Sequence, residues 1–224
     1  MILQIFIIFI IFLLSKIINN RQWIDSTCFV EKNVLSKNEC NKIIDIAKKY
    51  EFYKRNDMEK ILPEYQIEIF DNGIKNGELW NISKKIYDEK LERILRNEKW
   101  LSTKTLDLNF VFMKRYSSVD EKPYIPLHLD ESYLTMSFLL SNKNDFDGGE
   151  LYVFDLNESN RLSLTEQTTN FKLECRNEYV NNHKNLPVLK YNQGDLAVYT
   201  GGIHMHGILP VTRGERYILT FFFV

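Results

Sequence analysis

The second half of the sequence consists of short strand-like runs, and this feature restricts the possible folds more than any other. From about residue 105, runs rich in Val, Tyr, Phe and Leu alternate with turn signals such as Gly148-Gly149 and Gly194-Asp195. Because helical patterns precede these runs, the chain is predicted to be an α+β domain whose sheet part is a sandwich or a jelly roll. The predicted strands cover residues 108–116, 133–140, 151–154, 196–199 and 217–224.

Two helices are predicted before residue 105. Ser36 and Glu39 form an S-x-x-E capping box, in which each side chain satisfies a free backbone N–H of the first turn, so a helix begins here and extends to about residue 50. Apolar residues recur at near-helical spacing between about residues 78 and 96, which predicts the second helix. Residues 29–35 are typical of a short strand, residues 51–77 are mixed, and residues 155–189 are polar without a clear period.

The N-terminal segment is strongly apolar and predicts a membrane anchor or signal segment over residues 1–20. Its first residues read MILQIFIIFIIFLL, and the apolar stretch extends to Ile18. An 18-residue helix spans roughly 27 Å, close to the ~30 Å hydrocarbon core of a bilayer. No basic residue precedes the run and no small-residue cleavage site follows it, so an uncleaved anchor is favoured over a cleaved signal peptide. Lys16 and Arg21 follow the span, and the positive-inside rule would keep that side cytoplasmic.

The net charge argues against a nucleic-acid partner, and the cysteine spacing argues against a zinc site. The chain has 29 Lys and Arg residues against 30 Asp and Glu residues, so nothing in its net charge of -1 suggests the basic face that nucleic-acid binding requires. The three cysteines, Cys28, Cys40 and Cys175, lack the paired spacing of a zinc site. A single disulfide bond between Cys28 and Cys40 and three free thiols both remain open.

A histidine and an aspartate two residues apart are the first candidates for chemistry. In an extended backbone, residues i and i+2 project to the same side, so His128 and Asp130 point together. One imidazole and one carboxylate on one face are two of the three ligands of the facial triad that holds Fe(II) and leaves positions open. His204 and His206 are both candidates for the third ligand, since both can face the same way. Arg216 follows with a guanidinium group that binds carboxylates bidentately.

These residues and the motifs around them resemble the Fe(II)/2-oxoglutarate dioxygenases of the prolyl 4-hydroxylase and procollagen lysyl hydroxylase class. The resemblance covers about residues 105–224 and is closest to procollagen lysyl hydroxylase. It departs from collagen prolyl 4-hydroxylases, which typically have Lys at the position of Arg216. It also departs from lysyl hydroxylases, because the polar segment at 155–189 makes the distance in sequence between His128 and His206 longer than is expected for those enzymes. The points of likeness are Arg115-Tyr116 followed by Asp120-Glu121, His128-x-Asp130, Asp130-x-Ser132-x-x-Thr135, Gly148-Gly149, His204-x-His206 before Gly207, and Leu209-Pro210-Val211 before Arg216.

The resemblance implies a fold, a ligand set and cofactors. The fold is a double-stranded β-helix (a jelly roll) with flanking N-terminal helices, and the cofactors are Fe(II), 2-oxoglutarate and L-ascorbate. Iron is held by His128, Asp130 and His206, where His206 is preferred to His204 because its spacing to Arg216 matches the lysyl hydroxylase pattern. The same likeness implies that Arg216 binds the distal carboxylate of 2-oxoglutarate. For Tyr116 and Thr135, contact with this co-substrate and a merely structural place both remain open.

The expected function is that of a membrane-anchored dioxygenase that hydroxylates a peptidyl lysine or proline and releases succinate and CO2. Residues 1–20 are the anchor or signal segment, residues 21–104 the helical N-terminal part of the catalytic domain, and residues 105–224 the jelly-roll core. The expected partners are a protein or peptide substrate and a membrane. The catalytic domain is expected in the lumen of the endoplasmic reticulum, and this placement conflicts with the positive-inside rule. The alternative is a membrane-anchored jelly-roll binding module without turnover.

Overall fold

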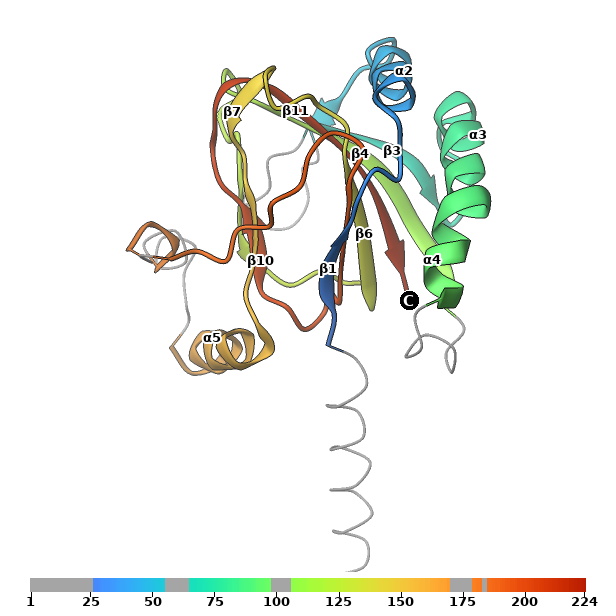
Figure 1. The fold of residues 1–224 in the computed structure, drawn as a ribbon. Helices are drawn as coiled ribbons and strands as arrows, with labels where there is room; N and C mark the ends of the chain where they lie inside the picture. The colour runs from blue at the N-terminus through green and yellow to red at the C-terminus, as the bar shows by residue number, and fades with distance from the viewer. Residues whose placement is uncertain (1–25, 55–64, 98–105, 170–178, 183–184) are drawn as a thin grey trace, which may run out of the picture.

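Two antiparallel sheets pack face to face at the centre of the protein (Figure 1). The computed structural model describes residues 26–54, 65–97, 106–169, 179–182 and 185–224. The large sheet has the strand order β1-β9-β6-β11-β4-β3-β2, with β7 paired to β11, and the small sheet has the order β5-β10-β8. The predicted jelly-roll architecture is therefore confirmed. The large sheet contains β1 (Cys28–Glu31), β2 (Tyr53–Lys54), β3 (Tyr65–Asp71), β4 (Leu108–Ser117), β6 (Leu134–Leu139), β7 (Phe146–Gly148), β9 (Leu196–Tyr199) and β11 (Val211–Phe223), and the small sheet contains β5 (Ile125–His128), β8 (Leu151–Val153) and β10 (His206–Ile208).

Alternation along the strands of the large sheet separates two cores. On β11, Leu219 and Phe221 belong to the core shared with the helices, whereas Ile218 belongs to the core between the two sheets. The polar Thr220 shares the inner face with Ile218, and both line a pocket there. Because side chains alternate with a period of two, the same strands build the outer core and the pocket wall.

The helical segments that precede β4 cover the outer face of the large sheet (Figure 1). The predicted capping box at Ser36 and Glu39 is present and begins α2 (Lys37–Ala47). The second predicted helix, 78–96, is also present, but a π-helical turn interrupts it. It consists of α3 (Gly77–Ile86), the π-helical turn η1 (Tyr87–Leu91) and α4 (Glu92–Asn97).

The structure differs from the sequence predictions in several short elements. Residues 155–189, for which no element is predicted, contain α5 (Leu156–Thr169), a weakly amphipathic helix whose Leu162 packs on the outer side of the small sheet. The mixed region 51–77 contains β3, where buried Ile67 and Ile69 face the helices. The predicted strand at 29–35 ends at Glu31, because Asn33 takes a left-handed conformation with φ of 55°. The sequence patterns also do not predict β5, β7 and β10, which have only three or four residues each.

The predicted membrane segment at residues 1–20 lies outside the described residues. Within the ranges that the structure describes, no helix is long and apolar enough to cross a bilayer. Cys28 and Cys40 are free thiols in the structure, so the possible disulfide bond between them is not present. Cys175 lies outside the described residues.

The capping box gives a testable pH dependence of stability. Burial alone would raise the pKa of Glu39, but hydrogen bonds from Lys90 and Ser36, together with the charge of Lys90, lower it to about 2. Because this value lies below that of an unfolded Glu, about 4.3, the carboxylate stabilises the fold above about pH 4.3, and this stabilisation is lost as the pH falls toward 2. The Glu39 side chain is 44% exposed, so solvent screens the ion pair.

We expect Glu39→Gln to lower the free energy of unfolding by about 0.5–1 kcal/mol at pH 7. The difference from the unmodified chain shrinks below pH 4, since the carboxylate is then protonated in the unfolded chain. Urea denaturation of both proteins at pH 7 and pH 3.5 measures it. An equal difference at both pH values would contradict the assignment.

Candidate active site

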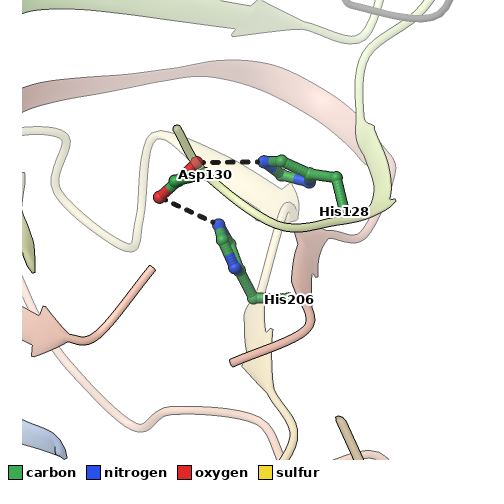
Figure 2. A group of neighbouring side chains, drawn as sticks. All are labelled: His128, Asp130 and His206. Carbon is green, nitrogen blue, oxygen red and sulfur yellow. Dashed lines mark ion pairs between the residues drawn. The ribbon is translucent and has the colours of Figure 1, made fainter. Parts of the chain in front are cut away.

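The small sheet brings His128 and His206 side by side. β5 and β10 are adjacent, and His206 pairs with His128 in their register. Asp130 follows β5, and its carboxylate lies between the two imidazoles, as Figure 2 shows, with 3.3 Å from His128 Nε2 to Oδ1 and 3.3 Å from His206 Nε2 to Oδ2. The ligand atoms of the three residues lie within 4.8 Å of one another. The three residues predicted to hold the metal therefore form one cluster, the triad.

Backbone carbonyl groups orient both imidazoles of the triad. His128 Nδ1 donates to the carbonyl of Pro126 at 2.8 Å, and His206 Nδ1 donates to the carbonyl of His204 at 2.8 Å. With Nδ1 engaged as the donor, the neutral form of each ring has its lone pair on Nε2, the atom that a metal would take, and only the protonated ring donates from Nε2 to Asp130. Such outer hydrogen bonds are the usual means of fixing the tautomer of a metal-binding histidine.

Hydrogen bonds from hydroxyl groups fix the position of the Asp130 carboxylate. Thr135 Oγ1 donates to Asp130 Oδ2 at 2.6 Å, and the Ser132 hydroxyl lies 2.8 Å from Thr135 Oγ1. Asp130 N donates to the carbonyl of Gly201 at 2.9 Å. A Cβ atom on Gly201 would lie 2.6 Å from Asp130 Oδ2, so this close approach requires glycine. Thr135, predicted to contact the co-substrate, thus supports Asp130; the co-substrate contact stays a prediction.

The three side chains of the triad shift one another's pKa values. Burial alone would raise the pKa of Asp130, but the charge of His206 and hydrogen bonds from both histidines hold it well below its usual range. Burial and the charge of His206 lower the pKa of His128. Burial would also lower the pKa of His206, but the Asp130 carboxylate raises it. The site therefore keeps a permanent anionic oxygen beside two imidazoles, the donor set that suits a divalent transition metal.

The side chain of His204 points away from the triad. Its Nδ1 donates to the carbonyl of Phe154 at 2.7 Å, and its Nε2 accepts from the hydroxyl of Ser26 at 3.0 Å. It is 3% exposed, and burial lowers its pKa. Strand β10 begins only at His206, and His204 N donates to the carbonyl of Thr200 in the preceding turn. The two histidines therefore do not share one extended face, and the structure brings only His206 to Asp130.

We expect His204→Ala to keep the metal and His206→Ala to lose it. Removal of the His204 side chain leaves its backbone carbonyl in place for His206 Nδ1, so metal affinity falls by about tenfold or less, the low end for groups that only support a ligand. Titration of both variants with Co(II), followed by its visible absorption, measures this. Loss of metal only in His204→Ala would show that the register of β10 is wrong.

The guanidinium group of Arg216 is buried in the same pocket as the triad. Arg216 is 1% exposed, and both it and Asp130 line this pocket. Its Nη2 donates to the hydroxyl of Tyr191 at 2.5 Å, and its Cζ lies 5.3 Å from the ring centroid of Tyr116. Its Nε and Nη1, and the hydroxyl of Tyr116, are buried without a hydrogen-bond partner. Among the described residues no carboxylate pairs with Arg216, so the site offers an unmatched buried positive charge.

The Gly148-Gly149 turn gives Arg216 its space. Both glycines have positive φ, 74° and 67°, as the sequence predicts for a turn of this type. A Cβ atom on Gly149 would lie 2.8 Å from Arg216 Cδ. The turn is therefore part of the wall of the site.

The pocket also contains residues that the sequence motifs do not indicate. Tyr191 and Tyr199 lie in it, and the Tyr199 ring centroid is 4.7 Å from that of His206. No pattern marks these tyrosines, since each lies in an apolar or irregular stretch. Lys114 also lines the pocket. The sequence could have indicated it, because it is a charged residue at an inward position of a strand, between Phe112 and Tyr116.

Comparison with known proteins gives fold neighbours only. No family model and no curated protein matches the sequence. Similar solved structures include a 2OG-Fe(II) oxygenase family oxidoreductase from Burkholderia pseudomallei, with 15% identity, a TM-score of 0.56 and coverage of 90% of this chain and 86% of that one. A prolyl hydroxylase from Trichoplax adhaerens, in complex with a hypoxia inducible factor peptide fragment, has 12% identity, a TM-score of 0.58 and coverage of 88% and 82%. HygX from Streptomyces hygroscopicus, with nickel and 2-oxoglutarate bound, has 16% identity, a TM-score of 0.55 and coverage of 89% and 83%.

These likenesses establish the fold of the chain. The architecture is that of 2-oxoglutarate oxygenases and prolyl hydroxylases, as the sequence resemblance predicts, and the structure contains the H-x-D…H triad that the resemblance implies.

Proposed function

We propose that this chain is an Fe(II)- and 2-oxoglutarate-dependent dioxygenase that hydroxylates a lysine or proline side chain of a protein or peptide. The observation that carries the proposal is the presence, in one pocket, of the triad and of the unmatched buried charge of Arg216. A metal-binding face next to a cationic cavity suits a co-substrate that chelates a metal at one end and carries a carboxylate at the other.

The residues fit an Fe(II) ion. Two imidazole Nε2 atoms and one carboxylate on one side of the pocket are the donor set of non-haem Fe(II) oxygenases, which leaves other coordination positions open. In this role His128, Asp130 and His206 would hold the metal, and Thr135 would keep the Asp130 carboxylate in place through its 2.6 Å hydrogen bond.

The residues also fit 2-oxoglutarate. Arg216 Nε and Nη1 and the Tyr116 hydroxyl are unpaired buried polar atoms, and a carboxylate bound there would satisfy them. When bound, Fe(II) with 2-oxoglutarate and O2 would supply the oxidising chemistry and release succinate and CO2. The chain's own contribution is to orient the co-substrate through Arg216 and to exclude water with the apolar wall of Ile125, Leu151 and Ile218.

A protein or peptide substrate is supported by one of the fold neighbours, which was solved with a peptide fragment bound. The choice between lysine and proline belongs to the proposal. Stimulation by ascorbate and a lumenal, membrane-anchored location stay predictions that rest on the resemblance and on residues 1–20.

The test is release of succinate by the purified full chain. We expect succinate formation that requires both added Fe(II) and added 2-oxoglutarate, and a gain of one oxygen atom on a proline- or lysine-containing peptide, detected by mass spectrometry. Chelation with EDTA is the control. If the protein binds no Fe(II) and releases no succinate with any peptide, the alternative of a jelly-roll binding module without turnover stands instead.

A further inference from the structure

Tyr191 is a buried residue of the pocket to which the proposed function assigns no role. It is 4% exposed, and it belongs to the core between the two sheets. Its hydroxyl accepts a hydrogen bond of 2.5 Å from Arg216 Nη2. Among the described residues no group accepts a hydrogen bond from the Tyr191 hydroxyl in return, so its proton is available to a ligand.

The backbone on either side of Tyr191 is fixed to the two sheets. Leu189 N donates to the carbonyl of Leu151 in β8 at 2.8 Å, and Gly194 N donates to the carbonyl of Leu139 in β6 at 2.8 Å. Tyr191 lies between these two hydrogen bonds, so the position of its ring is set by both sheets. A side chain supported in this way holds a binding geometry more precisely than one on a free loop.

Two tyrosines hold the guanidinium group of Arg216 without neutralising it. Tyr191 accepts its hydrogen bond, and the ring of Tyr116 lies within the range of a cation–π contact. Burial raises the pKa of both phenols more than the charge of Arg216 lowers it, so both are protonated and neutral at pH 7. A carboxylate in the place of Tyr191 would also fix the guanidinium group, but it would cancel the positive charge. The two phenols therefore orient Arg216 and leave its charge for a ligand.

The hydrogen bond to Tyr191 also sets the direction of the donors that Arg216 keeps. A guanidinium group has five N–H donors in one rigid plane, and Tyr191 takes one of them. Nε and Nη1 are buried without a hydrogen-bond partner. Because the group is planar and rigid, fixing Nη2 fixes these two nitrogen atoms as well. A carboxylate that enters the pocket meets donors that are already oriented, which reduces the entropic cost of binding.

We propose that Tyr191 is a positioning residue for the co-substrate: its hydroxyl fixes the plane of the Arg216 guanidinium group, and this fixed orientation makes the site selective for a 2-oxo acid with a distal carboxylate. The inference rests on the proposed function, since it takes 2-oxoglutarate as the ligand. Without the Tyr191 hydroxyl, Arg216 keeps its charge, but its Nη2 loses its partner and the donor plane is no longer fixed.

Calorimetric titration of the Ni(II)-loaded full chain with two ligands tests the proposal. 2-Oxoglutarate and 2-oxopentanoate have the same chain length and the same metal-chelating end, but the second has a methyl group in place of the distal carboxylate. We expect Tyr191→Phe to weaken 2-oxoglutarate binding roughly tenfold or more, the effect of one hydrogen bond to a charged group, and to leave 2-oxopentanoate binding unchanged. In turnover with Fe(II), the same variant should raise KM for 2-oxoglutarate and keep kcat.

Tyr217→Phe is the matched control. Tyr217 is 5% exposed and follows Arg216 on β11, but it faces the core on the helix side, where its hydroxyl donates to Glu215. Loss of this hydroxyl should leave the affinity for both ligands unchanged. Equal 2-oxoglutarate affinity in Tyr191→Phe and the unmodified chain, or an equal loss for both ligands, would overturn the positioning role and leave the proposed function intact.

A third ligand separates failure of this inference from failure of the proposed function. Glutarate has two carboxylates and no 2-oxo group, so it can bind the metal-free chain at Arg216 without chelating a metal. If the Ni(II)-loaded chain does not bind 2-oxoglutarate, the proposed function fails, and glutarate then decides the role of Tyr191. Weaker glutarate binding in Tyr191→Phe than in the unmodified chain supports the positioning role. Equal binding, or none in the unmodified chain, overturns it.

Discussion

Replacement of Asp130 by Asn is expected to lower the affinity for Fe(II) at least about 100-fold. Asp130 is the only anionic member of the triad, and a neutral amide cannot replace its charge beside the metal. Loss of a group that merely supports a ligand already lowers metal affinity by about 10- to 100-fold, so loss of the ligand itself should exceed that range. Asn keeps the shape of the side chain, which limits rearrangement of His128 and His206.

Thermal unfolding with and without metal measures this loss. A ligand that binds only the folded state at about 1,000 times its Kd adds about 4 kcal/mol, and a 100-fold loss of affinity should reduce this increment in Asp130→Asn to about 1.4 kcal/mol or less. Asp147→Asn is the matched control, because Asp147 is exposed and pairs with Arg213 away from the triad. Metal-dependent stabilisation of Asp130→Asn equal to that of the control would contradict the assigned ligand set.

The sequence predicts the strands that are dense in apolar residues better than the others, for a physical reason. The strands β4, β6, β8, β9 and β11 are rich in Val, Tyr, Phe and Leu, so they are visible whatever their length. The seven residues of β3 lie in a stretch interrupted by turn signals, and the short strands β5 and β10 show no period, although they carry His128 and His206. The ligand motif therefore has to be recognised from its spacing.

The choice between His204 and His206 shows where pattern reasoning ends. Alternation in an extended strand would put both on one face, but the chain turns before β10, and Ser26 and Phe154 capture the His204 side chain from distant parts of the sequence. Tyr191 is similar: its contact with Arg216 arises only when residues 25 positions apart meet in the fold. Long-range partners of this kind leave no local signal.

Arg216→Met should raise the 2-oxoglutarate concentration needed for turnover by about 30- to 4,000-fold, which corresponds to about 2–5 kcal/mol for a buried carboxylate that loses its charged partner. Met is preferred to Ala because it keeps most of the volume beside Gly149. Metal content should stay near normal, since Arg216 is not part of the triad. Arg216→Lys should recover only part of the affinity, because an ammonium group lacks the planar fork.

The stability of the Arg216→Met variant without ligand separates a co-substrate role from a structural one. In the unmodified chain the guanidinium group is buried with Nε and Nη1 unpaired, so its removal should leave the free energy of unfolding unchanged or higher. The stabilisation by added 2-oxoglutarate should then be lost. Arg213→Met, at an exposed position of the same strand, should change neither quantity. A variant that is strongly destabilised without ligand, yet keeps its normal 2-oxoglutarate dependence, would show that Arg216 serves the fold alone.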